Sequence, residues 1–233
     1  MYRIHDTPES EKLHMLDTLS QVLKLNLKVP LDNPSPKEFS NAMKAIKKDK
    51  HFPLMKIMLL RTMSKAVYSP NNIGHFGLAS EEYSHFTSPI RRYPDLMAHR
   101  MIREFHFNKN INSIKHFDEI LGSISSKNSE SERSAVQLER QIDDFKKAEF
   151  YERFVGTTKK AMIVTTLPSG FFVEFEDKVS AKASIKDLGE NYQLQANGVV
   201  ISNGKKSYKV GDYIFVIITK ADKHSGKIDI KLK

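Results

Sequence analysis

The chain contains 233 residues, of which 39% are hydrophobic, and this is enough for one large or two small domains with a real core. It contains no cysteine, which excludes disulfides, thiolate nucleophiles and cysteine zinc sites and suggests a cytoplasmic setting. The longest apolar run, Tyr213–Ile218, is far shorter than the ~20 residues of a membrane span, so no membrane partner is expected. A net charge of +9 favours a polyanionic partner, most often nucleic acid.

The first 150 or so residues predict helices separated by proline-marked breaks, because apolar residues recur at spacings of three and four. A leucine stripe follows Pro8, and Ser35–Pro36 has the capping serine and the proline of a helix start. Residues 53–67 are apolar around most of the circumference, which is typical of a buried helix rather than a surface one. A turn is expected at residues 69–72.

Three further helices are predicted before residue 155. Pro94 begins one that reaches about Phe107, and a second covers residues 113–126. Ser129 and Glu132 then form a capping box, which predicts that a separate long helix starts there and runs toward Phe154.

From Gly156 onward, β-branched and aromatic runs are cut by turn residues at 168–170, 203–204 and 225–226. This pattern predicts a small antiparallel barrel of about five strands, an OB-fold. Residues 153–233 carry 14 basic and 8 acidic side chains, against 23 and 20 in residues 1–152, so the barrel holds most of the excess positive charge. We therefore predict a multidomain α+β chain, mainly helical over residues 1–154 and an OB-fold over residues 155–233.

Arg91 and Arg92 lie at the start of the helix predicted around Pro94. Unpaired backbone N–H groups and the helix dipole favour an anion at such a place, so two guanidinium groups there suit a phosphate. The alternative is that the arginines pair with local acids, such as Glu81, Glu82 or Asp95. Residue chemistry alone leaves both interpretations open.

Metal chemistry is not favoured by the spacing of the histidines and acids. His75, His85 and His99 are separated by ten and fourteen residues with no carboxylate at ligand spacing, so we interpret them as packing or hydrogen-bonding residues. Asp143 and Asp144 point about 100° apart on a helix, which suits a solvated face. The sequence has no carboxylate cluster suited to two Mg²⁺ ions, no glycine-rich phosphate loop and no supported Ser-His-Asp arrangement.

Aromatic residues of the predicted barrel are candidate stacking platforms for bases: Phe171, Phe172, Phe175 and Tyr192. Because side chains alternate along a strand, only one of Phe171 and Phe172 is expected to be available to a base. Glu139 lies in the long predicted helix, and its spacing alone makes it an ordinary surface charge.

The stretch HFGLASEEYSHFTSPIRRYPDLMAH, residues 75–99, strongly resembles the signature of the ribonuclease II family. The likeness continues upstream through YRIHDTPESEKL and LLRTMSKAVYSPNNIGHFGLA, and downstream into an S1-type RNA-binding domain, so it covers essentially the whole chain. The resemblance implies that residues 1–154 are the C-terminal portion of an RNB catalytic domain and that residues 155–233 are an S1-type OB-fold.

The resemblance also implies a function. Family members processively hydrolyse single-stranded RNA from the 3′ end to nucleoside 5′-monophosphates, using water activated by two Mg²⁺ ions. Arg91 matches an arginine that contacts the scissile phosphate, and Arg92 is expected to support it or to contact the backbone nearby. Glu139 matches a residue near the 3′-terminal nucleotide, where a carboxylate accepts a hydrogen bond from a 2′-hydroxyl. The RNA-contacting positions matched in the barrel are Phe172, Asp222 and Lys227.

Two departures from the family pattern limit these expectations. The family's metal-binding aspartates precede the YRIH segment, so we expect a C-terminal piece that has no metal site, binds RNA and is inactive alone. Ser169 stands where an aromatic residue is usual and Ser184 where a histidine is usual. The RNA affinity of the barrel is therefore expected to depend mainly on its positive charge.

Two alternatives remain at this stage. In the first, the chain is a non-catalytic RNA-binding or adaptor protein that keeps an RNB-like helical body as a scaffold. In the second, the helical body docks a protein partner, and the barrel alone binds RNA. If an N-terminal half is missing, apolar surface is exposed, and association through that surface is expected.

Overall fold

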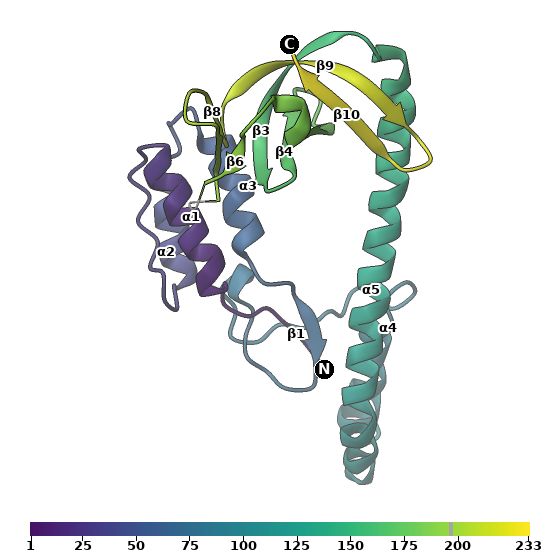
Figure 1. The fold of residues 1–233 in the computed structure, drawn as a ribbon. Helices are drawn as coiled ribbons and strands as arrows, with labels where there is room; N and C mark the ends of the chain where they lie inside the picture. Colours follow the sequence, from purple (N-terminus) through teal and green to yellow (C-terminus); the bar gives the residue numbers. More distant parts are fainter. Residues whose placement is uncertain (196–197) are drawn as a thin grey trace. The chain divides into compact units, whose positions relative to one another are not determined.

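A computed structural model describes residues 1–195 and 198–233 (Figure 1). The described chain forms two compact units, and the backbone passes between them more than once. The first unit consists of Met1–Leu13, Lys28–Lys44 and Leu59–Val136, and the second of His14–Leu27, Ala45–Met58 and Gln137–Lys233. The predicted domain limits, residues 1–154 and 155–233, stay a prediction.

Helices dominate the chain before residue 155, as predicted. The leucine stripe after Pro8 is buried along the first of them, and Ser35 caps the second through a reciprocal pair of hydrogen bonds with Glu38. The α-helices and short helical turns of this part are α1 (Ser10–Val22), α2 (Pro36–Ala45), α3 (Phe52–Thr62), η1 (Phe76–Leu78), α4 (Tyr93–Ile102), η2 (Arg103–Phe107), η3 (Ile111–Ser113), α5 (Ile114–Tyr151) and η4 (Glu152–Phe154).

The helix predicted at residues 53–67 is shorter and less buried than expected. It ends at Thr62, and Val67–Ser69 forms strand β2, which pairs antiparallel with strand β1 (Tyr2–Ile4). Leu60 is 59% exposed, so α3 has a solvent face and the expectation of an all-round buried helix is wrong. Val67, the last residue of the predicted helix, and the following Tyr68 pair with a distant strand, and this tertiary pairing overrides the local apolar pattern.

The capping box predicted at Ser129 is also wrong. Helix α5 runs without a break through residues 114–151. The Ser129 hydroxyl donates to the carbonyl oxygen of Ser125 at 2.9 Å and accepts the N–H of Tyr68 at 2.9 Å, while Glu132 binds Arg3. The two residues of the Ser-x-x-Glu pattern are therefore used for tertiary contacts, and the helix continues past them.

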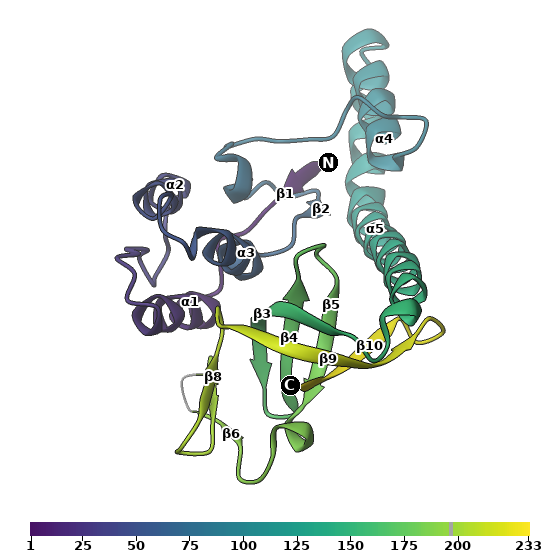
Figure 2. The same ribbon diagram turned by 90° about the horizontal axis from the view of Figure 1, so that it is seen from above.

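The barrel predicted near the C-terminus is present and closed (Figure 2). Its strand order is β10-β5-β4-β3-β9, with β10 and β5 parallel and the other described pairs antiparallel. The predicted turns at residues 168–170 and 225–226 join β3 to β4 and β9 to β10. The barrel strands are β3 (Thr158–Leu167), β4 (Gly170–Phe175), β5 (Ser180–Ser184), β9 (Tyr213–Asp222) and β10 (Lys227–Leu232).

A short turn, η5 (Ile185–Leu188), and a small separate sheet lie between β5 and β9 in the chain. The sheet contains β6 (Gln193–Leu194), β7 (Val200–Ser202) and β8 (Ser207–Lys209), and the predicted Asn203–Gly204 turn joins the last two. The mixed α+β class and the five-stranded OB-type barrel are thus confirmed. None of the described helices is long and apolar enough to cross a membrane.

Candidate nucleic-acid interface

The turn that precedes α4 holds Arg91 and Arg92. Both backbone N–H groups donate to the carbonyl oxygen of Ser88, at 3.2 and 2.9 Å. Arg92 has an extended backbone at the N-cap position, and Pro94 lies in the first helical turn, as the sequence predicted. Residues 88–92 therefore form a tight turn that leads directly into the positive end of a helix dipole.

Asp95 ties this turn to the interior of the first unit. Its side chain is fully buried, and its Oδ1 atom accepts the Ser88 N–H at 2.7 Å and a guanidinium N–H of Arg92 at 2.7 Å. Burial favours the neutral acid, but these two hydrogen bonds outweigh it and lower the pKa of Asp95 below its ordinary value. Arg92 therefore pairs with a local acid, which was one of the two interpretations left open by the sequence.

Arg91 differs from its neighbour. The residue is exposed, and among the described residues its side chain has no hydrogen-bond or ion-pair partner. Because the turn fixes the backbone of Arg91 while leaving its guanidinium group unpaired, the side chain is available to an anion at the start of α4.

The three histidines support the loop around this turn. The Nδ1 atom of His85 lies 2.8 Å from the Tyr68 hydroxyl, and Nε2 of His99 lies 2.9 Å from a backbone carbonyl oxygen. His75 stacks on His5 with ring centroids 5.0 Å apart. Burial lowers the pKa of both His75 and His85, which favours the neutral ring. Their interpretation as packing and hydrogen-bonding residues is confirmed.

An ion pair that the sequence did not reveal connects the first residues to α5. The Arg3 guanidinium donates to both carboxylate oxygens of Glu132, at 2.5 and 2.9 Å, and lies 4.6 Å from the ring centroid of Tyr68. The two charged residues are 129 positions apart. No local pattern signals such a contact.

Two acidic residues of α5 singled out by the sequence, Glu139 and Asp143, face solvent. Glu139 is exposed, and no described residue forms an ion pair with it. Asp143 lies 3.9 Å from Lys147 with its side chain 66% exposed, which agrees with the predicted solvated face. Mg²⁺ is the metal implied by the resemblance, but no group of three His, Asp or Glu residues in the described ranges could hold a metal ion. Within residues 1–195 and 198–233, the side chains therefore do not fit a metal centre.

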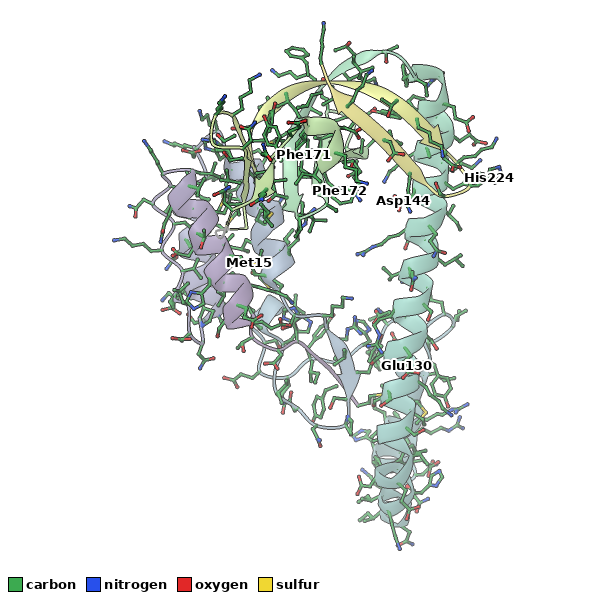
Figure 3. All side chains as sticks on the ribbon, viewed as in Figure 1. Met15, Glu130, Asp144, Phe171, Phe172 and His224 are labelled. Carbon is green, nitrogen blue, oxygen red and sulfur yellow. The ribbon has the colours of Figure 1, made fainter. Side chains whose placement is uncertain are left out.

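Strand β4 separates its two adjacent phenylalanines, as the alternation predicted. Phe171 is fully buried in the barrel, whereas Phe172 is half-buried on the outer face (Figure 3). The other two candidate platforms, Phe175 and Tyr192, are buried. Phe172 pairs in register with Lys182, which in turn pairs with Asp229 of β10. The available aromatic ring thus lies beside charged side chains on neighbouring strands.

Asp222 and Lys227 face each other across the hairpin of β9 and β10. Asp222 accepts the backbone N–H groups of His224 and Ser225 at 3.0 and 3.4 Å, and the hydrogen bond from Ser225 is the main reason that its pKa is lowered. Asp222 therefore has a structural task in the turn, and Lys227 is exposed. Their contact with RNA stays a prediction.

The mainly helical portion and the closed barrel define a mixed α+β chain with an OB-type barrel, a class of fold that commonly binds oligonucleotides. Residues 1–108 match the RNB domain. Over its whole length the chain is 48% identical to ribonuclease R of Mycoplasmopsis pulmonis, covering 33% of that protein, and 31% identical to ribonuclease R of Escherichia coli, covering 30%. The apo form of Mycoplasma genitalium RNase R matches the whole chain with a TM-score of 0.92 at 25% identity, and 37% of that chain is covered.

The chain resembles the RNB, or ribonuclease II, family, and within that family it is similar to ribonuclease R. It spans about one third of the length of the curated relatives that it matches. Yeast Ssd1, described as a pseudonuclease, shares the fold with a TM-score of 0.64 at 19% identity over 86% of this chain.

Proposed function

We propose that this chain is the RNA-contacting part of an exoribonuclease that hydrolyses single-stranded RNA from its 3′ end to nucleoside 5′-monophosphates. The observation that carries the proposal is Arg91, which is exposed, has no partner in the described part of the chain and lies in a turn fixed by the buried Asp95. Similarity to ribonuclease R over the whole chain supports it. In the proposed division, residues 1–154 belong to the RNB domain and residues 155–233 form an S1-type RNA-binding domain.

Arg91 is assigned to the scissile phosphate. A guanidinium group offers several N–H donors in a fixed plane, and the adjacent positive end of α4 adds to its attraction for an anion. A group held in place before the reaction stabilises the charge that builds on phosphoryl oxygens, without reorganising during the step. Arg92 supports this arrangement through Asp95, and the part of its side chain that stays exposed faces the RNA backbone nearby.

Glu139 is assigned to the 3′-terminal nucleotide. Its carboxylate is free of ion pairs among the described residues, so it can accept a hydrogen bond from a ribose 2′-hydroxyl. The outer face of the barrel gathers the RNA, with Phe172 stacking on a base and Asp222 and Lys227 contacting the strand. Mycoplasma genitalium RNase R has been solved in complex with ribose-methylated single-stranded RNA, which supports RNA as the partner.

The chain by itself is proposed to bind RNA without cutting it, because the described residues do not fit a metal centre. The test measures binding of fluorescently labelled oligo(A) by anisotropy and, separately, release of mononucleotides in the presence of Mg²⁺. We expect binding that weakens as salt is raised, and no mononucleotide. Mononucleotide release that Arg91→Ala abolishes would overturn the proposed inactivity. A cytoplasmic location stays a prediction.

The role of Arg91 is tested in a ribonuclease R that contains this segment. Arg91→Ala is expected to lower kcat by about 10²-fold or more, with a much smaller loss of RNA affinity, because the contact strengthens in the transition state. Arg103→Ala removes the same charge from an exposed position in η2 and serves as the matched control. Equal losses of kcat and affinity in Arg91→Ala would contradict the assignment and favour a non-catalytic RNA-binding protein.

A further inference from the structure

Two exposed aromatic residues on strand β9 have no role in the function proposed above. Tyr213 is 66% exposed and Phe215 is 58% exposed. They are two positions apart on one strand, so both side chains lie on the outer face of the barrel. Exposed aromatic rings on a folded surface are typical of sites that stack on a partner.

A lysine on the neighbouring strand lies beside these residues. Lys160 on β3 is the register partner of Phe215, and its Nζ atom lies 4.9 Å from the ring centroid of Tyr213. Met162, the next outward residue of β3, is the partner of Tyr213. We refer to Lys160, Tyr213 and Phe215 as the β3–β9 strip.

A cavity of about 950 Å³ adjoins the strip, and Lys160, Met162 and Tyr213 form part of its wall. Its size is at the upper end of the range of roughly 300–1,000 Å³ for ligand sites. All of its lining residues belong to the second unit, where α1 and α3 supply residues beside the barrel. Its basic lining residues are Lys24, Lys50, Lys160, Lys178 and Lys209.

The charge of the cavity favours an anion. Its acidic lining residues are Glu174, Glu176 and Asp212, so lysines outnumber carboxylates. Lys178 is paired with Glu174 at 2.8 Å, and Asp212 accepts the backbone N–H of Lys209 at 3.0 Å. No carboxylate among the described residues forms an ion pair with the ammonium groups of the other four lysines, which are therefore available to phosphates.

We propose that the β3–β9 strip and the lysines of the adjoining cavity form a second contact for single-stranded RNA. The inference rests on the proposed function. Bases stack on Tyr213 and Phe215, and the phosphates beside them pair with Lys160 and the cavity lysines. Lysines interleaved with stacking rings suit a single strand of any sequence, because every base presents a flat face. A second copy of this chain is a poorer occupant, since each copy carries a net charge of +9.

This contact is separate from the one assigned to Phe172. The outward neighbour of Tyr213 across β3 is Met162, whose partner on β4 is Glu174, two positions beyond Phe172. The ion pair of Glu174 and Lys178 therefore lies between the two aromatic surfaces. An RNA that contacts both surfaces has a longer stretch held by the barrel. Substitutions at the two surfaces are therefore expected to have additive effects on the free energy of RNA binding.

The first test uses a fluorescent reporter. The chain contains no tryptophan, so Tyr213→Trp introduces a single one. We expect its emission to be quenched as oligo(A) binds, because a base stacks on the indole. Phe107→Trp, at a residue that is 71% exposed in η2, is the matched control and should not respond. If the emission of Tyr213→Trp stayed unchanged while anisotropy reported bound RNA, the assignment of the β3–β9 strip to RNA would be overturned, and the proposed function would stand.

The second test measures affinity. The double variant Tyr213→Ala/Phe215→Ala is expected to bind oligo(A) about five-fold or more weakly, whereas Phe107→Ala binds as the parent chain does. Lys160→Gln should reduce the slope of log affinity against log salt by about 0.7, the value for one phosphate contact on a single strand. An affinity in the double variant equal to that of the parent chain would overturn the inference. The inference would also fail if, with no RNA present, the tryptophan emission of Tyr213→Trp depended on protein concentration, because a second copy of the chain would then occupy the strip. No RNA binding by the parent chain would overturn both proposals.

Discussion

Two regions of the molecule carry most of the residues assigned to RNA, and they hold them in opposite ways. In the first unit, the turn before α4 is tied to the fully buried Asp95, and Arg91 projects from that fixed turn. In the second unit, the outer face of the barrel presents Phe172 and Tyr213 on regular strands, and no buried ion pair fixes their side chains among the described residues.

The difference follows from what each region is proposed to do. A contact that must strengthen at one phosphoryl group needs a fixed position, because small displacements are costly in catalysis. A surface that gathers a strand of any sequence needs area and charge, and tolerates adjustment of individual side chains. We therefore expect substitutions behind the arginine turn to reduce stability, and substitutions on the barrel face to reduce affinity at nearly constant stability.

The largest expected effect on the free energy of unfolding comes from substitution of Asp95. Asp95→Ala leaves the partly buried Arg92 guanidinium and the Ser88 N–H without their shared acceptor, so we expect the free energy of unfolding to fall by about 3–5 kcal/mol. Urea unfolding followed by circular dichroism measures it. Arg91→Ala, one position from Arg92 but exposed, should change stability by no more than about 0.5 kcal/mol. Similar losses in the two variants would remove the distinction between the fixed turn and the free side chain.

The same carboxylate gives the turn a pH dependence. The pKa of Asp95 is lowered in the folded chain, so its contribution to stability is present above the ordinary pKa of about 3.9 and is lost as the pH falls toward the lower folded value. Unfolding free energies measured between pH 7 and pH 3 should fall more steeply for the parent chain than for Asp95→Asn. Parallel curves would show that Asp95 is not ionised in the folded state.

The second unit has a comparable buried anchor at the junction of α5 and the barrel. The Tyr151 hydroxyl donates to both carboxylate oxygens of Asp177, at 2.9 and 2.8 Å, and the Tyr151 side chain is fully buried. Tyr151→Phe is expected to lower the free energy of unfolding by about 1.5 kcal/mol, at the low end for a charged hydrogen bond because Asp177 is exposed to water. Urea unfolding measures this loss, with Tyr213→Phe as the exposed control.

The Tyr151 hydroxyl also makes the stability of the folded chain depend on pH in alkali. Burial and the Asp177 carboxylate raise the pKa of Tyr151 well above its ordinary value. The protonated hydroxyl therefore stabilises the folded state fully below about pH 10, and this contribution declines as the pH rises above that value. Stability should fall above pH 10 by more in the parent chain than in Tyr151→Phe, and equal declines would contradict the assignment.

The barrel was predictable from the sequence because its signals are local. Alternating apolar residues and the turns at 168–170 and 225–226 specify strands and hairpins within a few residues. The sheet of β1 and β2 was missed because its strands have three residues each and pair across a long stretch of chain. The pattern at Ser129 and Glu132 has a local meaning as a capping box, and only the contacts with Tyr68 and Arg3 show that it has another use.

The candidate site was predictable in its residue types but not in its division of roles. The sequence placed Arg91 and Arg92 at a helix start and left their pairing open, since the burial of Asp95 depends on the folded unit. Tyr213 and Phe215 belong to the longest apolar run of the chain, which is typical of a buried strand. Their exposure follows from the closure of the barrel, which turns alternate residues of β9 toward solvent.

The smallest expected changes in stability are on the barrel face, and adjacent residues of β4 provide the comparison. Phe171→Leu alters a fully buried ring and should cost about 1 kcal/mol of stability while leaving affinity for oligo(A) unchanged. Phe172→Leu keeps an apolar side chain on the outer face, so its stability should change by about 0.5 kcal/mol or less, while the loss of a stacking ring weakens RNA binding about five-fold. Thermal unfolding and anisotropy on the two variants separate the effects. If both variants lost affinity equally, the barrel would depend on its internal packing to bind RNA, and the contrast with the fixed arginine turn would fail.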